Sequence, residues 1–310
     1  MIRTMPLHIQ TPYLRSHTAS RRLGADVWLK LDALQPSGSF KLRGIGAVCA
    51  ARQAAGARRF VSSSGGNAGI AVAYCGRELG VPVLVVVPET ASVRARELIR
   101  GEGAEVIVHG ASWVEANAFA LAAVGEHDVF VHPFDDPVLW GGHATIVDEI
   151  AVVGPKPDAI VLAVGGGGLL CGVLEGLARN GWHDVPVVAV GTAGADCYAR
   201  SVAQRRPVEL PAIESIATSL GAKRPCDAAL EWASRHPIHP VVVSDAQAVA
   251  ASLRLVDEHR LVVEPACGAA LAALDRPVPV LAAASNIAVI VCGGVTAAIE
   301  QLQSGGATLR

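Results

Sequence analysis

Apolar runs alternate with stretches of helical periodicity along almost the whole chain. The apolar runs predict strands at residues 26–31, 59–62, 82–87, 105–108, 129–132, 159–164, 186–190 and 288–292. The periodic stretches predict helices, among them residues 42–55, 68–79, 92–102, 113–124, 139–151 and 169–179. Because most of the predicted strands are continuously apolar, we expect helices to cover both faces of each sheet. The order of the elements predicts an α/β protein with right-handed crossovers and mostly parallel sheets.

Composition and charge favour an enzyme that acts on a small molecule. The chain has 310 residues, of which 51% are hydrophobic, and this length allows one large or two medium domains. Its 26 lysine and arginine residues nearly balance its 28 aspartate and glutamate residues. Such a balance provides no basic surface for nucleic acid or for an anionic membrane. We therefore expect neither of them as a partner.

Three further patterns concern membranes, metals and redox state. The uncharged stretch 277–299 is long enough to span a bilayer, but its prolines and the Gly293-Gly294 pair favour a helix, a turn and a buried strand. Prolines interleave His236 and His239, which we expect in a loop rather than in a zinc site. Seven cysteines without a C-x-x-C pair indicate a reducing compartment. Since the first residues form no apolar signal segment, we expect a cytoplasmic protein.

Two glycine-rich loops each join a predicted strand to a predicted helix. The first covers residues 62–69 and adds serine hydroxyls and the side-chain amide of Asn67 to its glycines. The second contains four consecutive glycines at residues 165–168. Small residues let backbone N–H groups approach an anion, and the start of a helix favours negative charge. The four glycines match neither a dinucleotide-binding fingerprint nor a Walker A loop, so they predict a phosphate site without nucleotide signatures.

One lysine lies at an unusual position. The lysines of the chain are Lys30, Lys41, Lys156 and Lys223. Lys41 opens an apolar predicted helix, and a cation is unfavourable at that positive end of the helix. The position suits a lysine whose nitrogen is used covalently. Cys292, at the end of the last predicted strand, has the pattern of an ordinary buried thiol.

The segment Ser37-Gly38-Ser39-Phe40-Lys41-Leu42-Arg43-Gly44 resembles the lysine motif of fold-type II pyridoxal-phosphate enzymes. Within that group the chain is most similar to the L-serine/L-threonine dehydratases, particularly the liver type. Further blocks match in order at residues 63–69, 133–137, 165–172, 263–268 and 291–294. The resemblance implies the tryptophan synthase β-like fold, with two α/β domains around a cofactor cleft. We expect a small domain at residues 39–135 and a large cofactor-binding domain at residues 1–38 and 136–310.

The resemblance also assigns roles to individual residues. Lys41 would hold pyridoxal 5'-phosphate as a Schiff base, and Phe40 would lie against the pyridine ring. Cys292 would face the pyridine nitrogen. The phosphate would be held by the backbone amides of Gly165, Gly166, Gly167, Gly168 and Leu169. The substrate carboxylate would be bound by Ser64, Gly65, Asn67 and Ala68, with Asn67 also near the ring hydroxyl.

The implied reaction is an α,β-elimination. L-Serine would give pyruvate and ammonia, and L-threonine would give 2-oxobutyrate and ammonia. Lys41, displaced by the substrate amine, would remove the α-proton before the β-hydroxyl leaves. A thiol with an ordinary pKa of about 8.5 is neutral, so Cys292 would not keep the ring nitrogen protonated as a carboxylate would. The weaker withdrawal of electrons favours loss of hydroxide over transamination.

The chain departs from the liver-type pattern beside the phosphate loop. The pattern has glutamate and serine, which help to bind a monovalent cation, where this chain has Gly191 and Cys197. A cation near residues 165–168 and Ala195 would lose two oxygen ligands, the donors that alkali cations prefer, although Asp196 is a candidate replacement. Gly65 stands where the pattern usually has alanine, which predicts a looser pocket.

Other activities on the same fold stay open as alternatives. A β-replacement enzyme of the cysteine synthase type shares the lysine and the glycines, but usually has serine in place of Cys292. A serine racemase or D-amino-acid dehydratase needs a second acid/base group, and Ser64 is the candidate that joins Lys41 as catalytic. A catalytically silent protein would bind pyridoxal phosphate or another ligand without turnover. We expect an amino-acid substrate, a role in amino-acid metabolism and a homodimer.

Overall fold

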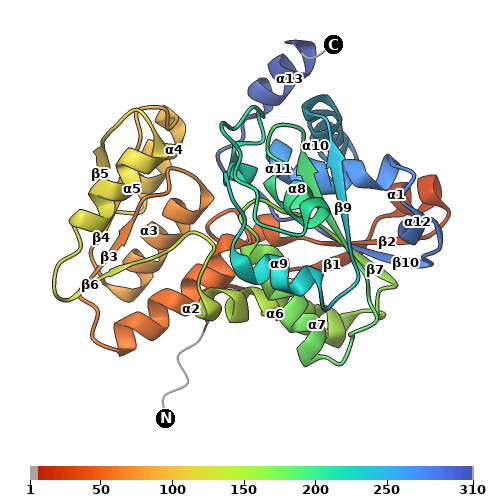
Figure 1. Cartoon of the computed structure of the whole chain (residues 1–310), viewed down its shortest axis with the longest axis horizontal. Helices are drawn as coiled ribbons and strands as arrows, with labels where there is room; N and C mark the ends of the chain where they lie inside the picture. Colours follow the sequence, from red (N-terminus) through yellow and green to blue (C-terminus); the bar gives the residue numbers. More distant parts are fainter. Residues whose placement is uncertain (1–5, 309–310) are drawn as a thin grey trace. The chain divides into compact units, whose positions relative to one another are not determined.

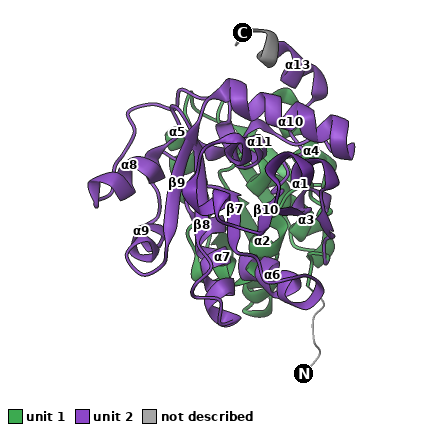
Figure 2. Cartoon of the chain, turned by 90° about the vertical axis from the view of Figure 1, so that its right-hand side faces the viewer, with its two compact units in different colours: residues 1–9, 35–142 green, residues 10–34, 143–310 purple. Residues whose placement is uncertain are grey.

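The computed structural model describes residues 6–308, and these fall into two compact units (Figure 1 and Figure 2). The smaller unit contains the described residues up to Ile9 together with residues 35–142, and the larger unit contains residues 10–34 and 143–308. Residues 6–9, 35–38 and 136–142 thus group with the smaller unit, whereas the sequence predicts them in the large domain. Residues 1–5 of that predicted domain lie outside the described residues. The assignment of cofactor binding to the large domain stays a prediction.

The smaller unit contains a four-stranded parallel sheet of order β5-β4-β3-β6. Its elements are α2 (Lys41–Ala54), β3 (Arg59–Ser62), α3 (Asn67–Leu79), β4 (Val83–Val87), α4 (Val93–Gly101), β5 (Glu105–Val108), α5 (Trp113–Ala122) and β6 (Asp128–Phe130). Helix α6 (Pro137–Val153) begins in this unit and ends in the larger one.

Strand β4 lies between helices, which is why its residues are apolar at every position. All of its residues are buried. Leu84 and Val86 pack with Ala116 of α5 on one face of the sheet. On the other face Val83 lies against α3, so close that a Cβ added to Gly76 would come within 2.1 Å of it. Helices therefore cover both faces, as continuously apolar strands predict.

The larger unit contains a six-stranded sheet of order β1-β2-β10-β7-β8-β9, in which β1 alone runs antiparallel to its neighbour. Its strands are β1 (Tyr13–Arg15), β2 (Asp26–Lys30), β7 (Ala159–Ala163), β8 (Val187–Thr192), β9 (Ile238–Val243) and β10 (Asn286–Ile290). Its α-helices are α1 (His17–Leu23), α7 (Gly168–Arg179), α8 (Cys197–Gln204), α9 (Asp227–Ala233), α10 (Asp245–His259), α11 (Pro265–Ala272), α12 (Pro279–Ala282) and α13 (Ile299–Thr308). Three short 3₁₀ helices are η1 (Asp32–Leu34), η2 (Thr218–Leu220) and η3 (Ala273–Asp275).

Helices cover both faces of this sheet as well. Helix α11 packs on β7 and β8, and α10 packs on α11. Helix α7 lies on the opposite side of the sheet in Figure 1. Strands β7 and β10 are parallel neighbours, so the loops that follow them leave the same edge of the sheet. In open α/β sheets that edge is where ligands bind.

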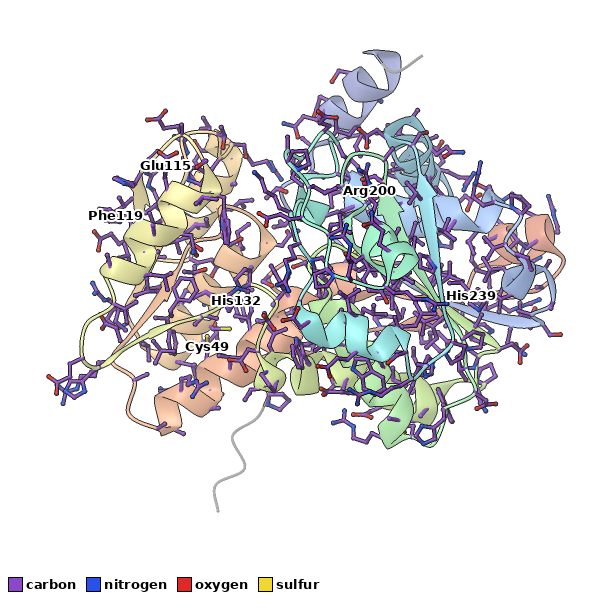
Figure 3. All side chains as sticks on the ribbon, viewed as in Figure 1. Cys49, Glu115, Phe119, His132, Arg200 and His239 are labelled. Atoms are coloured by element: carbon purple, nitrogen blue, oxygen red, sulfur yellow. The ribbon has the colours of Figure 1, made fainter. Side chains whose placement is uncertain are left out.

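The structure confirms the α/β class and the strands predicted from the apolar runs, but two strands were not predicted. Strand β1 has only three residues. His236 lies in a loop as predicted, but strand β9 contains His239 and Pro240, so the loop prediction is wrong for His239 (Figure 3). Proline is tolerated there because β9 is an edge strand, which among residues 6–308 pairs with β8 alone. Within residues 6–308, no helix combines the length and the apolar character needed to cross a membrane.

Candidate active site

Lys41 is the first residue of α2, and a tight turn precedes it. Gly38 has a φ of 75°, which glycine adopts without strain, and its N–H donates to the Gln35 oxygen at 2.7 Å. The hydroxyls of Ser37 and Ser39 are buried and have no hydrogen-bond partner among the described residues. Because buried hydroxyls are normally bonded, this turn has the polar groups expected where a ligand binds.

Within the smaller unit, the side-chain amine of Lys41 contacts a carbonyl oxygen and an aromatic ring. Its Nζ donates a hydrogen bond to the Pro133 oxygen at 2.5 Å and lies 5.1 Å from the centre of the Phe40 ring. Pro133 follows β6, which is the parallel neighbour of β3. The amine is therefore held at the carboxyl edge of the sheet, the same edge that the loop after β3 leaves.

The loop after β3 leads directly into α3. The first helical residue is Asn67, which is buried, and the first N–H groups of a helix have no acceptor inside it. The Gly66 N–H donates to the Ser64 hydroxyl oxygen at 3.4 Å. A Cβ added to Gly69 would lie 1.9 Å from the Ser64 carbonyl oxygen, so only glycine allows this approach of loop and helix. These groups, together with Ala68 in the first turn, form a site that suits a carboxylate.

Gly65 lies in the same loop, where the sequence predicts a looser pocket. A Cβ at this position would lie 3.0 Å from Ala91 Cβ and 3.3 Å from Val87 Cγ1. An alanine would therefore require its neighbours to move by a few tenths of an ångström. The side chains of Ala91 and Val87 occupy the space next to Gly65, and the structure does not support a looser pocket on this side.

In the larger unit, the four consecutive glycines join β7 to α7. A Cβ added to Gly165 would lie 2.8 Å from the Leu220 Cα. A Cβ added to Gly167 would lie 2.7 Å from Ala229 Cβ, and Gly167 has a φ of 100°. Both packing and backbone conformation thus require glycine. The first backbone N–H groups of α7, including that of Leu169, have no acceptor inside the helix, an arrangement that fits a phosphate.

Cys292 follows β10, so it lies at the same sheet edge as the glycine loop after β7. Its side chain is buried. A hydrogen bond with Cys267, burial, and the nearby charges of Glu264 and Asp32 raise the pKa of the Cys292 thiol well above its usual value. The thiol is therefore neutral at physiological pH.

The region where the resemblance implies a cation has a thiol in contact with the glycine loop. Cys197 Sγ donates to the Gly165 oxygen at 3.8 Å, and burial raises the pKa of this thiol to about 11. Asp196 Oδ2 accepts from Arg200 Nε at 2.9 Å, while its Oδ1 is buried without a partner among the described residues. In the part of the chain that the structure describes, no three His, Cys, Asp or Glu side chains are grouped as a metal site requires.

Within each unit, the structure brings the predicted residues to one sheet edge. The smaller unit has Lys41, Phe40 and the Ser64 loop there, and the larger unit has the glycine loop and Cys292. His132 is not among the predicted site residues, although it directly precedes the block 133–137 that resembles the family. Cys267 is also absent from that set, because nothing in its spacing from Cys292 indicates their contact.

Comparison with known proteins identifies the class to which this fold and these loops belong. The model of the family described as "Pyridoxal-phosphate dependent enzyme" matches residues 4–293, and the chain therefore belongs to this family.

The most informative relatives carry more specific names. The chain is 45% identical to the "L-serine dehydratase/L-threonine deaminase" of Bos taurus over 313 residues, which cover 97% of this chain and 96% of that protein. It is 46% identical to the human "Serine dehydratase-like" protein, over 96% of this chain and 94% of that one. Among solved structures, a fungal L-serine ammonia-lyase from Rhizomucor miehei has 36% identity and a TM-score of 0.94, covering 99% of this chain and 100% of the other. Maize serine racemase has 26% identity and a TM-score of 0.89, covering 98% and 93%.

The residues present fit the cofactor that the family name implies. Gly165 and Gly167 leave no room for side chains, and the loop offers backbone amides to a phosphate. The Lys41 amine lies at a sheet edge, and the turn that precedes Lys41 has buried hydroxyls that lack protein partners among the described residues. The Cys292 thiol provides a neutral buried group, compatible with an uncharged ring nitrogen.

Proposed function

We propose that this protein is an L-serine/L-threonine ammonia-lyase. It removes water from L-serine or L-threonine, and hydrolysis then releases ammonia with pyruvate or 2-oxobutyrate. The observation that carries the proposal is the buried, neutral Cys292 thiol at the end of β10, next to the strand that leads into the glycine loop. The names of the bovine relative and of the fungal structure support the same reaction.

Each part of the site has one task in this reaction. When bound, pyridoxal phosphate supplies an aldehyde that condenses with amines and a ring that accepts electrons. Lys41 Nζ would hold the cofactor and then take the proton from the substrate α-carbon. Phe40 would pack against the ring and exclude water from it. The phosphate would be bound by the backbone amides of Gly165, Gly166, Gly167, Gly168 and Leu169.

The loop after β3 would orient the substrate. The backbone amides at the start of α3 and the side chains of Ser64 and Asn67 are donors for the substrate carboxylate, with Gly65 and Ala68 lining the same loop. Fixing the carboxylate would aim the α-proton at the Lys41 amine. Because the Cys292 thiol does not protonate the ring nitrogen, electrons would leave with the β-hydroxyl more readily than they would be stored on the cofactor.

Serine racemisation is the second candidate function. It is supported by the likeness to maize serine racemase and by the hydroxyl of Ser64. The Gly66 N–H donates to that hydroxyl oxygen, a contact that does not use the O–H proton of Ser64. Ser64 would then be the second acid/base group.

The proposal extends to ion dependence, assembly and location. We infer a weak dependence on a monovalent cation, since the Cys197 thiol contacts the Gly165 oxygen where an oxygen ligand would be needed. A homodimer is supported by exposed apolar side chains of the larger unit, namely Leu14, Val152 and Val153. Seven cysteines without a C-x-x-C pair support a reducing, cytoplasmic location.

The test is product release by the purified protein from L-serine, L-threonine and their D-forms, with Lys41→Ala as the control. We expect keto acid and ammonia in equal amounts from the L-forms and neither product from the variant. Formation of D-serine without keto acid would identify a racemase. Formation of cysteine from a β-substituted alanine and sulfide would identify a β-replacement enzyme, and bound cofactor without any product would identify a silent binding protein.

A further inference from the structure

His132 lies between β6 and the turn that contacts Lys41 (Figure 3). Its ring nitrogen Nδ1 accepts the backbone N–H of Asp135 at 2.8 Å and that of Phe134 at 3.3 Å. The residue between His132 and Phe134 is Pro133, whose carbonyl oxygen receives the Lys41 amine. The imidazole therefore braces the same turn that presents this oxygen to the lysine.

Neighbouring aromatic side chains restrict the imidazole. The Phe134 ring meets it edge-on, with ring centres 4.7 Å apart and planes at 75°. The Phe130 ring lies on the β6 side, with ring centres 6.4 Å apart. The indole N–H of Trp140 donates to the Phe134 oxygen at 2.8 Å, so the turn is bonded on a second side. The turn is thus held by the side chains of His132 and Trp140.

The acceptor role requires an uncharged ring. A nitrogen that accepts two N–H groups carries no proton, so the proton of the neutral ring is on Nε2. Burial lowers the pKa of His132 below its usual value. Among the charged groups that face the ring, Asp135 and Asp136 of the same loop act to raise this pKa, and Lys41 of α2 acts to lower it. Protonation at Nδ1 would place an N–H of the ring next to the two backbone N–H groups, so that three donors would face each other. It would also add a positive charge beside Lys41.

We propose that His132 is a positioning residue for Lys41. Its neutral Nδ1 fixes the turn, and the turn holds the Pro133 carbonyl oxygen where it binds the lysine amine. This inference rests on the proposed function, in which the amine must leave the cofactor, act on the substrate and return. The Pro133 oxygen gives the amine a defined position during the interval when it is not attached to the cofactor, and His132 keeps that position in place.

Three variants separate this role from general packing. His132→Asn keeps an acceptor oxygen close to the position of Nδ1 and cannot be protonated. His132→Leu keeps bulk and removes the acceptor. His127→Leu is the matched control, because His127 is exposed on the same segment. The readouts are kcat/KM for L-serine and, independently of turnover, the dissociation constant of pyridoxal phosphate from its visible absorbance on the protein, both followed between about pH 5 and pH 8.

At about pH 8 we expect His132→Leu to lose about tenfold in kcat/KM and in cofactor affinity, while His132→Asn stays within about threefold of the unmodified protein and the control does not change. As the pH falls, both readouts of His132→Asn should improve relative to the unmodified protein, because only histidine becomes protonated.

The inference is overturned if the ratio of kcat/KM, and that of the cofactor dissociation constant, between His132→Asn and the unmodified protein do not change with pH. This test holds even where His132→Leu does not fold. Equal behaviour of His132→Leu and His127→Leu also overturns it. An unmodified protein that neither develops the visible band nor releases keto acid contradicts the proposed function itself, which distinguishes the two failures.

Discussion

The side-chain amine of Lys41 and the main-chain oxygen of Pro133 are 2.5 Å apart, although the two residues are 92 positions apart in the chain. The contact joins the start of α2 to the segment that follows β6. Lys30 differs, since it is fully buried and paired with the carboxylate of Glu149, which stabilises its charge. A carbonyl oxygen can position an amine, but it stabilises the charge of the amine less strongly than a carboxylate does. This suits Lys41, because its amine must lose a proton in the proposed reaction.

Cys292→Asp tests the role of the neutral thiol. A carboxylate beside the ring nitrogen would keep that nitrogen protonated, so we expect pyridoxamine phosphate formed per keto acid to rise at least about tenfold. Thermal stability should also fall, because the new carboxylate would be buried near Glu264 and Asp32. Cys267→Ser is the control, since it alters the hydrogen-bond partner of the thiol without adding charge. If Cys292→Asp forms no more pyridoxamine phosphate per keto acid than this control does, the proposed role of the neutral Cys292 thiol is contradicted.

Gly167→Ala tests the packing and the conformation of the glycine loop. Gly181→Ala is the matched control, because Gly181 has a φ of 72° but no atom of the described residues within 4 Å of an added Cβ. We expect the control to cost about 1 kcal/mol in the free energy of unfolding, from the positive φ alone. Gly167→Ala should cost about 2–4 kcal/mol and weaken binding of pyridoxal phosphate, with partial recovery in Gly167→Ala/Ala229→Gly. Equal losses in denaturant titrations of the two single variants would show that the predicted contact is absent.

Cys197→Ser tests the dependence on a monovalent cation. The unmodified protein should change kcat/KM by less than about threefold when potassium replaces a bulky organic cation, since alkali ions bind thiols poorly. The serine variant restores an oxygen beside the Gly165 carbonyl and should gain a dependence on potassium. Cys171→Ser, another buried cysteine near the loop, is the control. A strong requirement for potassium in the unmodified protein would refute this account of the cation.

The stability of the protein in acid should depend on His132. The pKa of His132 is lowered in the folded state, while the unfolded value is about 6.5. Below about pH 6.5 the unfolded state therefore binds more protons than the folded state. The contribution of neutral His132 to the free energy of unfolding is complete above that pH, and it is lost as the pH falls toward the pKa of His132 in the folded state. Relative to His132→Asn, the unmodified protein should lose free energy of unfolding over this window. Chemical denaturation at a series of pH values would detect this loss. A difference in the free energy of unfolding between the two proteins that stays constant with pH would exclude the predicted role of His132.

The sheets could be predicted because their signal is local. Val83–Val87 is apolar at every position and lies buried between helices. Strand β9 could not be predicted in the same way, since it includes Pro240 and exposed positions, and its pairing depends on the distant β8.

The candidate site was predictable to a similar extent. Lys41 could be identified from its place at a helix start within a family-like motif. The role of His132 depends on the distance from its Nδ1 to two amides of a turn, and on a lysine that approaches only in the folded chain. The charge state of Cys292 depends on Cys267, which α11 brings beside it. Contacts of this kind arise from tertiary packing and leave no spacing pattern in the sequence.

The most direct measurement is reduction of the cofactor-loaded protein with borohydride, followed by mass spectrometry of its peptides. The chain has four lysines, so each possible attachment site can be distinguished. The account predicts a phosphopyridoxyl group on the peptide that contains Lys41, and its absence in Lys41→Ala, together with loss of keto-acid production by at least about a thousandfold. A label on Lys30, Lys156 or Lys223, or a label and turnover that persist in Lys41→Ala, would contradict it.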